Sequence, residues 1–259
     1  MRMKRVVGQW LVFLATAGAA LLGGAGCADS ESMLFIRQAQ ARVSSGANGC
    51  TVDSSPSSLF ITGGALDLAF RTEYSASLLV GNQLVARGNS SQLRTETSRV
   101  EIEGAVVRLE DGRNTVWGPF TVPGAGFIDP ATGSTPSYGV TETILLGSAY
   151  GNSLVAELRQ SLTFRRFTSV VKVIGKTLGG TAVESGEWRF PLTVCYACLV
   201  SFPPEANDPK LTRPNCDLPA GTGTTVAAPC SLGQDDAVDC RVCKLSVRPQ
   251  DISLCQPSF

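Results

Sequence analysis

Sulfur carries most of the chemistry that this chain could perform, because it has nine cysteines and no histidine. Without histidine the chain lacks Ser-His-Asp and Cys-His catalytic sets, histidine-ligated metals and the commonest general base. Seven of the cysteines lie between Cys195 and the C-terminal Phe259, a density typical of a disulfide scaffold. The first question is therefore which cysteines pair and which act otherwise.

Cys27 is set apart from the others because it follows an apolar segment near the start of the chain. Three basic residues precede that segment, which runs from Val6 to Leu22 and is followed by small residues. This order of charge, apolar run and small residues is typical of a secretory signal. We predict a signal peptide over residues 1–26.

The residues before Cys27 resemble the lipobox of bacterial lipoproteins, in which a peptidase cuts before a cysteine that carries lipid. Ala25 and Gly26 fit this pattern, whereas Gly24 stands where leucine is usual. We expect acylation of Cys27, as in palmitate-bearing lipoproteins, and hence a bacterial envelope protein anchored in a lipid bilayer, on the periplasmic side or at the cell surface. Ordinary secretion after Gly26 and an uncleaved anchor are the alternatives.

The other cysteines are even in number, and the predicted destination of the chain is oxidising. Disulfides are the default in that setting, and we expect four among Cys50, Cys195, Cys198, Cys216, Cys230, Cys240, Cys243 and Cys255. If all pair within the chain, Cys50 bonds to one of the seven near the C-terminus. The connectivity stays open, except that a strand running through both Cys195 and Cys198 would keep those two apart.

Two CxxC motifs, at Cys195–Cys198 and Cys240–Cys243, raise the possibilities of zinc or redox chemistry. Zinc is disfavoured because the motifs are far apart, other cysteines lie between and after them, and the compartment is oxidising. A thioredoxin-like motif is disfavoured because no helical pattern follows either CxxC. We predict no metal and no cofactor.

Other polar residues have simpler interpretations, and we predict no catalytic residue. A carboxylate pair for hydrolysis or a calcium site would require convergence that the spacing does not predict. A Ser–Lys nucleophile is disfavoured in a strand, where residues three apart face opposite sides. The two tryptophans are interpreted as core or sheet residues. These candidates are Glu101, Glu103, Glu110 and Asp111; Asp235, Asp236 and Asp239; Ser169 and Lys172; and Trp117 and Trp188.

The elements that must position these residues are mostly strands. Short runs of alternating or apolar residues separated by turn residues cover much of residues 57–202. In the run 99–109 the apolar positions change phase at Gly104, which predicts a β-bulge. Pro119 indicates an edge strand over 116–122. The strand predictions cover 59–61, 66–70, 77–85 (with a turn or bulge at Gly81-Asn82), 99–109, 116–122, 140–146, 170–174 and 187–202.

Three other segments complete the predicted organisation. Residues 27–49 are interpreted as a lipid-anchored leader, in which the apolar piece 33–36 could be an edge strand. Residues 152–162 suit a helix stripe or an alternating strand, and their helix-forming composition favours a short helix. Residues 203–259 form a cysteine-rich, loop-rich tail packed on the β domain. We predict a mainly β fold, an immunoglobulin-like β-sandwich over 50–202 with one short helix and a disulfide-stapled tail.

Several segments resemble a group of uncharacterised cysteine-rich envelope lipoproteins of myxobacteria and their relatives. They are VIGKTLGG at 173–180, VES at 183–185, FPLTVCYACL at 190–199 and CSLGQDDAVDC at 230–240. The resemblance implies export, a lipid anchor and paired cysteines. It implies no activity.

These observations favour a non-enzymatic envelope lipoprotein with a binding, adhesion or structural role, whose partner is an unidentified envelope protein or glycan. Cleavage before Cys27 leaves 19 basic residues against 22 acidic ones, so no nucleic-acid partner is expected. A hydrolase using carboxylates or a metal is the alternative. A periplasmic folding or redox factor is a third possibility, which a solvent-facing CxxC with a free thiol would favour.

Overall fold

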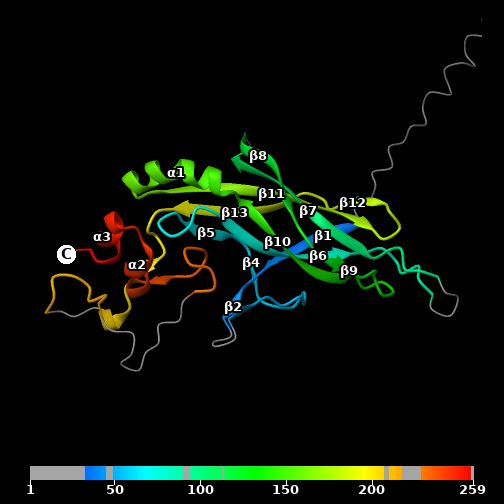
Figure 1. The fold of residues 1–259 in the computed structure, drawn as a ribbon, viewed down its shortest axis with the longest axis horizontal. Helices are drawn as coiled ribbons and strands as arrows, with labels where there is room; N and C mark the ends of the chain where they lie inside the picture. Colours follow the sequence, from blue (N-terminus) through cyan, green and yellow to red (C-terminus); the bar gives the residue numbers. More distant parts are fainter. Residues whose placement is uncertain are drawn as a thin grey trace, which may run out of the picture. The chain divides into compact units, whose positions relative to one another are not determined.

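The computed structural model describes residues 33–44, 49–89, 94–112, 114–206, 210–217 and 229–257. The predicted signal peptide, Cys27 and the start of the predicted leader lie outside the described residues. Within them the chain forms two larger β-sheets (Figure 1). The prediction of a mainly β, sandwich-like fold is confirmed.

The first sheet has four strands in the order β10-β6-β1-β4. All its pairings are antiparallel. Its strands are β1 (Leu34–Gln40), β4 (Phe60–Ile61), β6 (Tyr74–Asn82) and β10 (Ser137–Leu146).

The second sheet has seven strands, and its main path is β5-β13-β11-β7-β8. All its pairings are antiparallel except that of β13 with β5, which is parallel. The two strands of this parallel pair end side by side, at Cys195 and Asp67. The strands are β5 (Gly64–Asp67), β7 (Val100–Asp111), β8 (Asn114–Pro123), β9 (Phe127–Ile128), β11 (Phe164–Thr177), β12 (Ala182–Glu184) and β13 (Trp188–Cys195).

One hydrophobic core joins the two sheets. Tyr74 and Leu78 of β6 belong to the same buried cluster as Leu109 of β7 and Phe190 of β13. Tyr74 lies with its ring centroid 5.9 Å from that of Phe190. The sheets therefore bury their apolar faces against each other, as in a β-sandwich.

The strand β7 confirms the bulge predicted at Gly104. Ile174 of β11 pairs with Gly104, but the next residue, Gly175, pairs with Ile102, so Glu103 is the extra residue. The bulge keeps Val100 and Ile102 buried on one side of it and Val107 and Leu109 buried on the other. The predicted edge strand is also confirmed, since β8 ends the path of the second sheet.

The interpretation of residues 27–49 as a leader is wrong for Leu34–Gln40, which form a strand of the first sheet. The strand β1 lies between β6 and β4 rather than at an edge. It carries Gln38 and Gln40, whose polarity suggested a linker, but both are buried. Gln40 Nε2 donates to the carbonyls of Asp53 and Ser55 at 2.9 and 2.8 Å, so the buried amide is satisfied.

The turn or bulge predicted at Gly81-Asn82 is likewise not observed. The strand β6 runs through Gly81, which pairs with Phe35 on one side and Tyr138 on the other. These two rings meet edge to face across the glycine, with centroids 6.0 Å apart. Glycine lets the Phe35 ring lie over the strand, because a Cβ atom at this position would come within 2.3 Å of that ring and displace it.

The ambiguous segment is helical, as favoured. The helix α1 (Ser148–Ser161) begins earlier than predicted, after Gly147, and has no side-chain cap. Its buried residues Leu154 and Leu158 join the main core. Tyr150 packs against Trp117 of β8 and Phe167 of β11, which seats the helix on the second sheet.

The C-terminal tail has more regular structure than predicted. Besides α1, the described residues contain the short helices α2 (Cys240–Ser246) and α3 (Ile252–Cys255), so the prediction of one helix is wrong. The Asp239 carboxylate caps the start of α2, where it accepts a hydrogen bond from the Arg241 N–H at 2.9 Å. Six small elements in the described part of the chain lie outside the two large sheets: the strand pair β2 (Val43–Ser44) and β3 (Cys50–Thr51), the strand pair β14 (Val200–Ser201) and β15 (Val238–Asp239), and the 3₁₀ turns η3 (Pro204–Ala206) and η4 (Pro249–Asp251).

The tail is tied to the sandwich by specific contacts. Asp251, which is 2 % exposed, accepts from the Tyr196 hydroxyl and the Arg159 guanidinium, both at 2.8 Å. Val247 and Leu254 pack against the main core. Among the described residues, no helix has the length and apolar character needed to cross a bilayer.

Candidate functional site

The four disulfides account for all eight cysteines that the structure describes. The bonds are Cys50–Cys230, Cys195–Cys198, Cys216–Cys240 and Cys243–Cys255, with Cα atoms 5.5–5.9 Å apart. The prediction that Cys50 bonds to a C-terminal cysteine is confirmed. A chain with four disulfides belongs in an oxidising, non-cytoplasmic compartment.

The bond between Cys195 and Cys198 corrects the expectation that these two residues stay apart. That expectation required a strand through both, but β13 ends at Cys195. The chain then turns, with Ala197 in the left-handed conformation at φ 57°. The turn brings the two Cα atoms to 5.9 Å, within the range for a disulfide.

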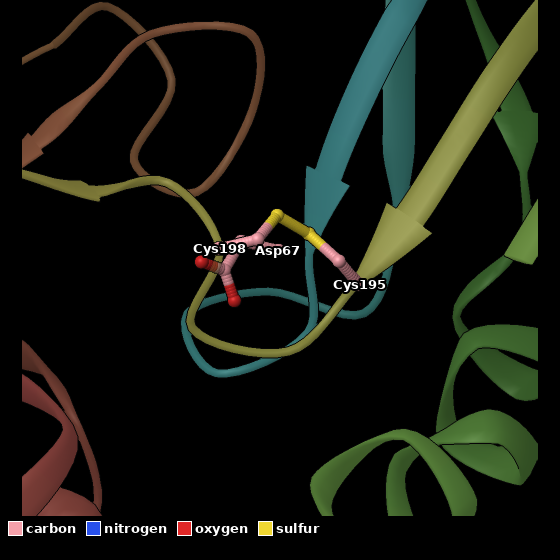
Figure 2. Close-up of side chains that lie close together, drawn as sticks. All are labelled: Asp67, Cys195 and Cys198. Carbon is pink, nitrogen blue, oxygen red and sulfur yellow. A yellow bond between two sulfur atoms is a disulfide. The ribbon is translucent and has the colours of Figure 1, made fainter. Parts of the chain in front are cut away.

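A buried carboxylate holds this turn. Asp67, at the end of β5, is 0 % exposed. It accepts hydrogen bonds from the backbone N–H groups of Ala197 at 2.6 Å, Leu199 at 2.9 Å and Ala69 at 3.0 Å. Figure 2 shows the disulfide and Asp67 together where the two strands end and the turn begins. The parallel pairing of Cys195 with Asp67 places the carboxylate at this point.

The environment of Asp67 opposes its negative charge. Burial raises the pKa of the Asp67 carboxyl, and the hydrogen bonds from the backbone N–H groups of the turn only partly offset this. A carboxyl with a raised pKa can hold or release a proton nearer to neutrality than an exposed aspartate can. Such a group beside a disulfide is a candidate for chemistry as well as for structure.

The same three side chains form a possible metal-ligand set. One ligand atom from each of Asp67, Cys195 and Cys198 lies within 4.8 Å of the others, the one such group among the described residues. Thiolates, rather than disulfide sulfurs, bind zinc. The sulfur atoms here share a bond, so this arrangement offers a metal only the carboxylate.

The second CxxC motif has a different structure. Cys240 and Cys243 lie on α2, which contradicts the expectation that no helix accompanies either motif. Each bonds to a cysteine outside the motif, and all four sulfur-bearing residues are nearly inaccessible. The two motifs therefore do not converge on a common site.

A small cavity lies between residues of β1 and β6 of the first sheet and the segment that follows Cys230. Its volume is about 80 Å³, and its lining includes Arg42, Ser77 and Asp235. The Ser77 hydroxyl is buried and has no hydrogen-bond partner among the described residues. Burial raises the pKa of Asp235, whose carboxylate accepts from the Tyr74 hydroxyl at 2.9 Å. This space suffices for a few water molecules.

Two of the four acidic residues considered on β7 are engaged in ion pairs. Glu110 bonds to Arg108 and Arg189, which lower its pKa, and Asp111 bonds to Arg165 at 3.0 Å. Glu101 and Glu103 are exposed on β7.

The remaining candidates are dispersed. Asp239 caps α2, Asp235 lines the cavity and Asp236 lies beside it, and these three do not form a metal-ligand group in the described part of the chain. The predicted strand orientation of Ser169 and Lys172 is confirmed, since Ser169 is buried and donates to the Leu145 carbonyl, whereas Lys172 bonds to Glu184. Trp117 is exposed against Tyr150, and Trp188 stacks on Phe190.

Sequence reasoning missed Asp67. Its alternation with Leu66 and Leu68 predicts a place on the exposed face of a half-buried strand, whereas Asp67 is fully buried. Its partners lie 130 and 132 residues further along the chain, beyond any local pattern. The one usable signal is the position of Asp67 within an otherwise apolar run, Leu66-Asp67-Leu68-Ala69-Phe70.

No protein-family model matches this chain, and no curated protein is significantly similar to it. The function must therefore be inferred from the chain's own residues.

Proposed function

We propose that this protein is a non-enzymatic bacterial envelope lipoprotein, anchored through an acylated Cys27, with a binding, adhesion or structural role. The observation that carries the proposal is the pairing of the eight other cysteines among themselves. Cys27 is thus the one cysteine of nine outside these bonds. A cysteine at that position, after an apolar segment and small residues, is suited to acylation.

The disulfide bonds of the fold support a role outside the cytoplasm. Cys50–Cys230 connects segments 180 residues apart, and two further bonds hold a tail that has little core of its own. Small cores in exported proteins are commonly stabilised in this way. A fold that disulfides stabilise suits a protein that stays at the envelope, where cytosolic chaperones and reductants are absent.

The engagement of polar groups supports a non-enzymatic role. The buried carboxylate of Asp67 holds a turn, that of Asp251 holds the tail, and Glu110 is enclosed by two arginines. Each of these three carboxylates thus has a structural role, and its removal would leave its hydrogen-bond donors without an acceptor. The partner is proposed to be an envelope protein or glycan rather than a substrate to be converted.

The anchor is tested in cells that express the full chain. We expect native protein to incorporate a labelled fatty acid and to sediment with membranes, whereas Cys27→Ser loses both properties because serine offers no thiol. Ser30→Ala, three residues further on, is the matched control and should behave as the native protein does. Mass spectrometry should locate the lipid on Cys27.

Two outcomes would contradict the proposal. One is a native protein that begins with an unmodified residue after cleavage. The other is membrane association that survives Cys27→Ser without the label. Either would replace the lipid anchor by ordinary secretion or by an uncleaved apolar segment.

A further inference from the structure

The Cys195–Cys198 bond has one exposed cysteine, as the Cys50–Cys230 bond also does, whereas the two bonds within the tail have none. Cys198 is exposed, whereas Cys195 is 2 % exposed. The four cysteines of the tail bonds Cys216–Cys240 and Cys243–Cys255 are each at most 3 % exposed. A thiolate that attacks a disulfide must reach one of its sulfur atoms. At this bond it can reach Cys198, while the buried partner becomes the leaving group.

The surroundings of Cys195 can receive the sulfur that leaves. The Cys195 Sγ lies 3.5 Å from the carbonyl oxygen of Leu66 and within 4.8 Å of a carboxylate oxygen of Asp67. Both oxygens can accept a hydrogen bond from a thiol. A reduced Cys195 therefore finds both acceptors already in place. Figure 2 shows Asp67 beside the disulfide.

The rest of the site does not depend on the disulfide. β13 remains paired with β5 and β11, and the Leu68 N–H donates to the Cys195 carbonyl at 2.9 Å. Asp67 continues to bind the N–H groups of Ala197 and Leu199. The two thiols would thus stay close after reduction, ready to form the bond again.

We infer that Cys195–Cys198 is a thiol–disulfide exchange site, with Cys198 as the attacked sulfur and a protein dithiol as the reacting partner. A thiolate of the partner attacks the Cys198 Sγ, and the Cys195 sulfur leaves with the electron pair and takes up a proton. The second thiolate of the partner then attacks the mixed disulfide and releases Cys198, which is also protonated. In total the partner loses two electrons and two protons and becomes a disulfide, while Cys195 and Cys198 become thiols.

The order of reduction in the native protein tests this inference directly. Folded protein is treated with a low concentration of dithiothreitol, quenched with an alkylating reagent at successive times, and mapped by mass spectrometry. We expect Cys195 and Cys198 to be labelled at least about tenfold faster than the four tail cysteines, because access governs the exchange rate. Tryptophan fluorescence should stay unchanged during the reduction. In a parallel sample that is freed of dithiothreitol and reoxidised with glutathione disulfide before alkylation, Cys195 and Cys198 should no longer be labelled.

Single substitutions test which sulfur is attacked. In Cys195→Ser the remaining thiol is exposed, so glutathione disulfide should add a glutathione to Cys198. In Cys198→Ser the remaining thiol is buried, so the same addition to Cys195 should be about tenfold slower or more. Labelling of the tail bonds before Cys195–Cys198, an unfolding transition that accompanies its opening, or equal reactivity of the two variants would each overturn the inference. The native-protein experiment decides even if a variant does not fold, and neither experiment depends on the lipid anchor.

Discussion

The bond between Cys50 and Cys230 offers the sharpest test of what stabilises this protein. It closes a loop with a sequence separation of 180 residues. It also fixes the segment that follows Cys230, where Gln234 Nε2 donates to the Ser75 carbonyl at 2.7 Å and Asp235 accepts from Ala65 and Tyr74. The double substitution Cys50→Ser/Cys230→Ser removes the bond and leaves these contacts to hold the segment alone.

The expected loss follows from the entropy of the unfolded chain. For a separation of 180, loop closure predicts a decrease of about 5 kcal/mol in the free energy of unfolding. For the separation of 3 at Cys195–Cys198, the same relation predicts about 1.6 kcal/mol. The difference between the two, about 3.6 kcal/mol, depends only on the ratio of loop lengths, since the constant contribution cancels.

Urea unfolding followed by tryptophan fluorescence measures both values. Cys195→Ser/Cys198→Ser is the matched control, because it also replaces one disulfide by two hydroxyls. We expect Cys50→Ser/Cys230→Ser to shift the unfolding midpoint far more than the control does. Losses that agree within about 1 kcal/mol, or a larger loss in the control, would refute the reasoning from loop length.

Three further predictions concern single side chains. Asp251→Ala should decrease the free energy of unfolding by about 2 kcal/mol, since it leaves Tyr196 and Arg159 without their shared acceptor, and urea unfolding would contradict this if the loss were negligible. Gly151→Ala should lower the free energy of unfolding by more than about 1 kcal/mol although alanine favours helices, because the new Cβ would clash with the Thr72 carbonyl oxygen. Ala156→Gly on the same helix is the control for helix propensity alone, and a Gly151→Ala protein more stable than the native one would contradict the prediction. Asp67→Asn should change the pH dependence of the free energy of unfolding. Because the pKa of Asp67 is raised in the folded state, its contribution to stability is complete below the ordinary aspartate pKa and is lost as pH rises through the folded pKa. The stability of the native protein relative to the variant should therefore fall as pH is raised towards neutrality, and a rise over that interval would contradict the prediction.

Much of the fold could be predicted because alternation of apolar residues reports directly which face of a strand is buried. The run 99–109 is the best example, since even the bulge at Gly104 shows as a change of phase. The extent of β1 and its place inside the first sheet could not be predicted, for a related reason. Gln38 and Gln40 are polar by type, but the carbonyls that satisfy Gln40 come from a segment that only the folded chain brings near. Sequence pattern reports hydrophobicity, not the completion of hydrogen bonds.

The cysteines could be counted but not fully paired from sequence. With Cys27 set aside and all other cysteines paired within the chain, parity requires that Cys50 bond to a C-terminal cysteine, and it does. The pairing of Cys195 with Cys198 depended instead on where β13 ends, and strand ends are the least predictable feature of a β-protein. The end is set here by a carboxylate from another strand, because Asp67 binds the N–H groups that a continuing strand would have presented to a neighbour.

The same geometry explains why structure and reactivity coincide at Asp67. A turn short enough to join cysteines three apart must expose several N–H groups at its inner side, and a buried carboxylate is a strong acceptor for them. Once placed there, the carboxylate necessarily lies beside the sulfur atoms. The buried Asp67 carboxylate is thus a consequence of the turn that it stabilises. Because Cys198 in that turn is exposed, the same structure also offers a disulfide at which thiol exchange can be tested.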